Sequence, residues 1–73
     1  MKNDNIRKQT RLIIRKNGEY LVGAILYGTD LRWSRSPYDA WGTRDRDKAE
    51  EYARRTGGIV MLWNPVVRQM RVL

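Results

Sequence analysis

Residues 10–27 read TRLIIRKNGEYLVGAILY, and this stretch decides the fold. An Asn-Gly pair at positions 17 and 18 separates two runs that are rich in β-forming residues. Such a pair is typical of a two-residue hairpin, because a type I′ turn needs positive φ at both central positions. The turn also fixes the register, so we expect Arg15 to lie opposite Tyr20.

A third strand is expected to follow a second turn. Residues 28–30 (GTD) have turn chemistry, and a three-residue loop there would pair Tyr27 with Leu31. The same register would bring Ile25 opposite Trp33. The first three strands are therefore predicted to form an antiparallel meander.

The segment after residue 44 has helical periodicity. Ala49, Tyr52, Ala53 and Thr56 recur at i, i+3, i+4 and i+7, which predicts a helix over residues 45–56 with one narrow buried stripe. Two glycines then end it. The apolar run 59–63 and the final run 67–72 read as strands that pair with each other, although the last strand could instead pair with a partner or a second copy.

The predicted fold is therefore an α+β domain, a small antiparallel sheet with one helix packed on one face in the order β-β-β-α-β-β. Residues 10–73 are expected to form this single domain. Residues 1–9 are expected to form a flexible basic arm, because six Lys or Arg residues stand against one Asp in residues 1–16.

Composition narrows the function classes. The chain has 73 residues, 15 Lys and Arg against 8 Asp and Glu, and neither Cys nor His. These counts remove the usual zinc ligands and every thiol or imidazole nucleophile, so we expect no enzyme, no metal and no cofactor. The charged N-terminus and the short apolar runs predict a cytoplasmic protein with no membrane contact.

Alternation along the strands sorts the side chains into two faces. The expected core face holds Leu12, Ile14, Leu21, Ile25, Tyr27, Leu31 and Trp33. The opposite face holds Arg11, Ile13, Arg15, Tyr20, Val22, Ala24, Leu26, Arg32 and Ser34. On that face, arginines around Tyr20 suit base stacking with phosphate partners, whereas the alternative is a solvated outer face.

The loop around residues 33–41 is the second candidate. Three aromatic residues, Trp33, Tyr38 and Trp41, alternate with Arg32, Arg35 and Arg44. Aromatic rings beside arginines suit base stacking and equally suit a protein interface. The alternative is that Tyr38 and Trp41 fold back as a lid over the edge of a small core.

Two resemblances rest on these motifs. The sequence resembles small uncharacterised proteins of bacterial phages and conjugative elements. This resemblance rests on the stretch WSRSPYDAW at residues 33–41, the following Thr-Arg-Asp, the helix with Ala49 and Ala53, the glycine pair and the Asn-Pro at 64–65. The β-β-β-α order is similar to the integrase arm-binding and AP2 type of domain, which reads the DNA major groove with a three-stranded sheet. This chain adds two strands after its helix.

The sequence thus favours a non-catalytic, basic binding module. DNA or RNA is the expected partner, with Arg11, Arg15, Tyr20, Arg32, Arg35, Tyr38 and Trp41 as its contacts. The alternative is a protein-interaction module, such as a small regulator or inhibitor from a mobile element, that binds an acidic protein surface through the loop of residues 33–41 or the final strand. Either would be a monomer or a weak homodimer.

Overall fold

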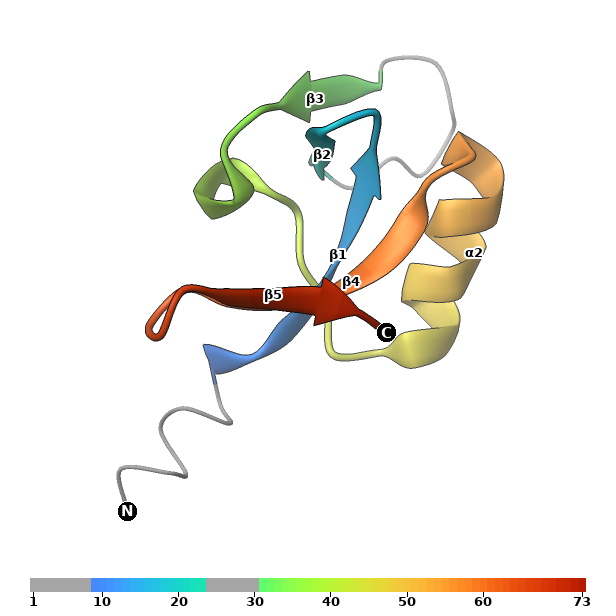
Figure 1. Ribbon diagram of the computed structural model, residues 1–73. Helices are drawn as coiled ribbons and strands as arrows, with labels where there is room; N and C mark the ends of the chain where they lie inside the picture. Colours follow the sequence, from blue (N-terminus) through green and yellow to red (C-terminus); the bar gives the residue numbers. More distant parts are fainter. Residues whose placement is uncertain (1–8, 24–30) are drawn as a thin grey trace.

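The computed structural model describes residues 9–23 and 31–73. Its elements are β1 (Arg11–Lys16), β2 (Glu19–Val22), β3 (Arg32–Ser34), the 3₁₀ helix η1 (Pro37–Asp39), α2 (Arg46–Thr56), β4 (Ile59–Asn64) and β5 (Gln69–Val72). The strands form one antiparallel sheet in the order β3-β2-β1-β4-β5, with α2 along one side (Figure 1). The α+β class and the element order that the sequence predicts are confirmed.

The first hairpin has the predicted turn. Asn17 and Gly18 adopt φ values of 54° and 76°, the positive pair that a type I′ turn requires. Arg15 pairs with Tyr20, as the sequence predicts. The register of the first two strands is therefore set by the turn itself.

The register between β2 and β3 differs from the prediction. Trp33 lies opposite Leu21, not opposite Ile25. Gly23 has a φ of 81°, a conformation that a regular strand does not use, so β2 ends at Val22. The difference of four positions is even, so Trp33 keeps its predicted face. The proposed turn at residues 28–30 and the residues Ile25 and Tyr27 lie outside the described residues.

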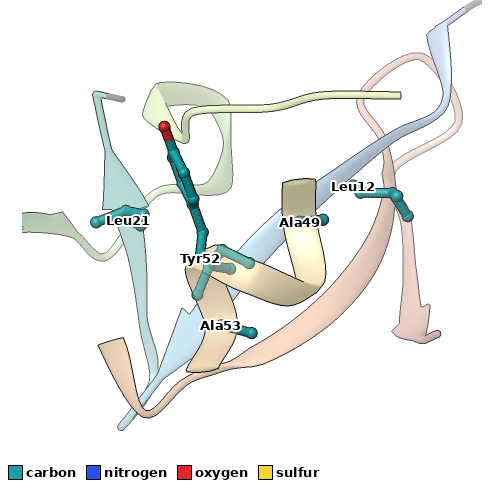
Figure 2. Close-up of a cluster of buried hydrophobic side chains, with 6 residues drawn as sticks. Leu12, Leu21, Ala49, Tyr52 and Ala53 are labelled. Atoms are coloured by element: carbon teal, nitrogen blue, oxygen red, sulfur yellow. The ribbon is translucent and has the colours of Figure 1, made fainter. Parts of the chain in front are cut away.

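The helix lies on the predicted core. The Asp45 side chain accepts a hydrogen bond from the Lys48 amide, and Gly57, with a φ of 75°, ends the helix. The predicted stripe of α2 is buried, and α2 packs against β1 and β4. Leu12, Ile14, Leu21, Ala49, Tyr52 and Ala53 form this helix-side core (Figure 2). Leu31, which we expected there, is instead 43% exposed.

The two C-terminal strands pair as predicted. β4 and β5 run antiparallel, with Trp63 opposite Met70. The Asn64 side-chain oxygen accepts hydrogen bonds from the amides of Val66 and Val67 at 2.9 and 3.3 Å, which stabilises the turn between the strands. Because this turn extends through Arg68, β5 begins at Gln69 rather than at residue 67.

An irregular segment lies between β1 and β2 beyond the hairpin turn. Leu12 and Thr43 exchange two backbone hydrogen bonds of 2.7 and 3.0 Å, and the Trp41 amide donates to the Leu21 carbonyl oxygen at 2.8 Å. Residues 40–43 therefore occupy the place that a continuous β1–β2 ladder would fill. We call these residues the inserted segment. Ala40 packs on one side of the sheet and Trp41 on the other.

The sheet has a second core on the side away from α2. Ile13, Tyr20, Met61 and Trp63 are buried there, and the partly buried Ala40 and Met70 pack against them. We call this side the far face. The sheet is thus packed on both sides, because Leu12 and Ile14 of β1 point toward α2 whereas Ile13 between them points into the second core.

Candidate nucleic-acid interface

Three arginines lie on the far face. The registers place Arg11 opposite Trp63, Arg15 opposite Tyr20, and Arg32 opposite Val22. Side chains directly opposite each other in a sheet point to the same side, so all three arginines share the side of the second core. Arg11 and Arg15 are half-buried at the two ends of β1, and Arg32 is exposed on β3.

Tyr20 does not form the expected stacking surface. Its side chain is only 9% exposed and belongs to the second core, so its ring has no open side for a base. The solvated-face alternative is also wrong for the centre of the far face, because four residues are buried there. The cause is the segment of residues 35–42, which folds over this side of the sheet and contributes Ala40 to the second core.

Tyr38 is the exposed ring of the far face. It is 57% exposed and meets Trp63 edge to face, with ring centroids 5.3 Å apart at 86°. Its position is set by η1: the Ser36 hydroxyl accepts a hydrogen bond from the Tyr38 amide, and Pro37 suits the first helical position. The ring is therefore in contact with Trp63, while more than half of the residue stays exposed to solvent.

The other loop aromatics lie elsewhere. Trp41 stacks on Tyr52 of α2, with centroids 4.5 Å apart and planes 24° apart, and Trp33 packs against the same helix-side core. The lid interpretation is therefore correct for Trp41, whereas Tyr38 stays outside. Arg35 is exposed in the same loop. The far face therefore carries arginines and one exposed aromatic ring, Tyr38, whereas Trp33 lies in the core as the sequence predicts and Trp41 does not join the expected contacts.

Arg11 and Arg15 each line a hollow. Arg11, Gly42, Thr43 and Arg44 surround a hollow of about 220 Å³. The Arg11 stem lies directly over Gly42, where an added Cβ would be 2.6 Å from the Arg11 Cδ. At the other end of β1, a hollow of about 400 Å³ is lined by Arg15, Lys16, Asn17, Gly18, Gly57 and Ile59. Both hollows are open and basic.

Acidic residues are kept away from the far face. Its strand residues include no Asp or Glu, and among the described residues only Asp39, in η1, approaches this side through a 3.2 Å hydrogen bond from the Ser34 hydroxyl. The remaining described carboxylates lie on the helix side of β2 or in α2 and its cap. Within that described part, Arg46 and Arg55 form ion pairs, both inside α2, so the far-face arginines keep an uncompensated charge.

A groove that sequence reasoning missed runs along β5. It has a volume of about 610 Å³ and is lined by Thr10, Leu62, Asn64, Arg68, Gln69, Met70 and Arg71. Arg68 in the β4–β5 turn and Arg71 in β5 both line it, and these two arginines near the end of the sequence are a signal that could have indicated it. Arg71 lies opposite Leu62, which places it on the helix side of the sheet.

The described residues contain no group of three Asp or Glu residues close enough to hold a metal ion, and no helix among them is long and apolar enough to cross a membrane. The site therefore offers positive charge, an aromatic ring and backbone polar groups.

Comparisons with known protein families, with curated proteins and with solved structures each gave no significant match.

Proposed function

We propose that the protein is a non-catalytic nucleic-acid-binding module that contacts the phosphate backbone through the arginines of the far face. The observation that carries this proposal is the separation of charge: Arg11, Arg15 and Arg32 share the far face, on which no described strand residue is Asp or Glu. A basic surface of this kind attracts a polyanion and is not neutralised from within.

The roles follow from position. Arg11 and Arg15 are four residues apart on β1, which separates their Cα atoms by about 14 Å at about 3.4 Å per residue. They would therefore bind different phosphates. Arg32 and Arg35 are exposed on and after β3 and extend the basic surface. Since guanidinium groups bind phosphate oxygens in a bidentate manner, each arginine contributes orientation as well as charge.

Tyr38 supplies the stacking contact. An exposed ring that already packs against Trp63 has a restricted orientation, so a base can stack on it at a low cost in conformational entropy. Stacking does not depend on base identity, and neither do phosphate contacts. The proposed binding is thus weakly sequence-specific.

The test is a fluorescence anisotropy titration with labelled single-stranded DNA, duplex DNA and RNA of equal length at several salt concentrations. Four phosphate contacts predict a log–log slope of about −3, so affinity falls roughly sixty-fold between 50 and 200 mM salt. The variant Arg11→Gln/Arg15→Gln should halve that slope. The matched control is Lys48→Gln/Arg54→Gln, which removes the same charge from exposed helix positions.

The two double variants distinguish binding at the far face from a general attraction to the net charge of the protein. If both lower the affinity equally, the attraction is general and the far face is not the interface. Tyr38→Leu should weaken single-stranded DNA or RNA by about tenfold and duplex DNA less, because only unpaired bases can stack. Unchanged affinity in Tyr38→Leu would exclude the stacking role, while leaving the phosphate contacts to the arginine test.

A further inference from the structure

The outer edge of β5 pairs with no other strand among the described residues. In the part of the chain that the structure describes, β5 is an end strand of the sheet, next to β4 alone. Val72 and Leu73 are 63% and 42% exposed at this edge, and Ile59 at the start of β4 is 51% exposed. An open strand edge beside exposed apolar side chains is a site where another extended chain can add to a sheet.

The alternation of hydrogen bonds along β5 shows which of its backbone N–H and C=O groups point away from β4. The Leu73 amide donates to the Val60 carbonyl oxygen at 3.1 Å, so Leu73 faces β4. Antiparallel ladders alternate, and the Arg71 and Gln69 backbone groups therefore also point toward β4. The N–H and C=O groups of Met70 and Val72 point outward. An added strand would find two donors and two acceptors at this edge.

The two sides of β5 differ in chemistry. Met70 and Val72 lie opposite Trp63 and Met61, so their side chains are on the far face and form an apolar row. Arg71 lies on the helix side, where it lines the 610 Å³ groove together with Arg68. Within the described residues neither arginine has a carboxylate partner. A strand that adds here would meet apolar groups on one side and positive charge on the other.

We propose that the β5 edge binds an extended peptide segment of a partner protein in which apolar and acidic residues alternate. The apolar residues would pack beside Met70 and Val72, and the acidic residues would enter the groove beside Arg71 and Arg68. Alternation is required because successive side chains of a strand point to opposite sides. This proposal is independent of nucleic-acid binding, which uses other residues.

A second copy of the chain fits this edge poorly. Each copy carries a net charge of +7, and two antiparallel β5 strands that pair Met70 of one copy with Val72 of the other would place Arg71 opposite its own copy. Like charges directly opposite each other destabilise a strand pair. The charge of the edge therefore selects an acidic partner.

The experiment titrates the full chain into a fluorescein-labelled peptide that alternates valine and glutamate over eight residues. Control peptides replace glutamate with lysine, or place proline at alternate positions to remove the donors. Val72→Pro removes an outward N–H without breaking a bond to β4 and should weaken binding about tenfold. Arg71→Glu should lose the acidic peptide and gain the lysine peptide, a swap that misfolding cannot produce.

The outcomes are distinct. Binding of the acidic alternating peptide alone, with the charge swap in Arg71→Glu, would support the proposal. Equal binding of the proline-containing peptide would show general attraction to acid and overturn it, as would concentration-dependent dimers in analytical ultracentrifugation that Val72→Pro abolishes. Val72→Pro and Arg71→Glu are also titrated with single-stranded DNA. Val72→Pro should leave that affinity unchanged, so the two proposals can fail separately.

Discussion

Tyr52 has a buried hydroxyl group without a partner, and removing it should stabilise the protein. The residue is 5% exposed, and its oxygen makes no hydrogen bond among the described residues. Figure 2 shows the ring rising from α2, with the hydroxyl end directed away from the helix. A buried polar group without a partner costs about 1–3 kcal/mol. Tyr52→Phe removes that cost and keeps the stack on Trp41.

The expected gain is about 1 kcal/mol in the free energy of unfolding. For a chain of this size, that gain raises the melting temperature by about 4–8 °C. Urea denaturation followed by tryptophan fluorescence measures the change, and the slope of the transition should stay constant. Tyr38→Phe is the matched control: it removes the same atom from a ring that is 57% exposed, so stability should change by less than about 0.5 kcal/mol.

A loss of stability in Tyr52→Phe would refute this reasoning. It would mean that the hydroxyl is hydrogen-bonded in solution, since only a lost partner makes the deletion of one oxygen unfavourable. A gain in both variants would also contradict it, because burial would then not be the cause.

Three further substitutions test the packing and the turns, each by urea denaturation. Leu21→Ala removes a fully buried side chain and should cost about 3 kcal/mol; a cost below 1 kcal/mol would contradict its place in the core. Asn64→Ala removes two bonds that hold the β4–β5 turn and the 3.0 Å bond that the Asn64 side-chain amide donates to the Thr10 hydroxyl, and it should cost about 2 kcal/mol. Asn64→Asp should recover part of this cost, since the accepting oxygen remains. Gly57→Ala should cost about 1 kcal/mol because φ is 75° there, and Gly57→Asn less; equal values would argue against the left-handed helix end.

Much of the fold could be predicted because its signals are local. The Asn-Gly turn sets the first register, and Asp45, the buried stripe and Gly57 define the helix. Each signal lies within a few residues of the element that it specifies. The pairing of the last two strands was predictable for the same reason, since only a short turn that starts at Asn64 and Pro65 separates the two β-forming runs.

The rest depends on contacts between distant segments. The position of Trp33 opposite Leu21 follows from the end of β2 at Gly23, which a pattern of β-forming residues does not reveal. The burial of Tyr20 depends on the segment of residues 35–42 folding over the far face. For the candidate site, the alternation of side chains along the strands correctly placed the arginines on one side of the sheet. It could not show that Tyr38 is the aromatic ring that stays exposed.

The inserted segment makes the two cores interdependent. Its backbone bonds join Leu12 of β1 to Thr43 and Trp41 to Leu21 of β2, while Ala40 and Trp41 pack into opposite cores. Opening it would break the backbone link between β1 and β2 beyond the Arg15–Tyr20 pair and admit water to both sides of the sheet at once. The amide protons of Leu12, Trp41 and Thr43 should therefore exchange with solvent as one cooperative unit, with a common opening free energy close to that of global unfolding.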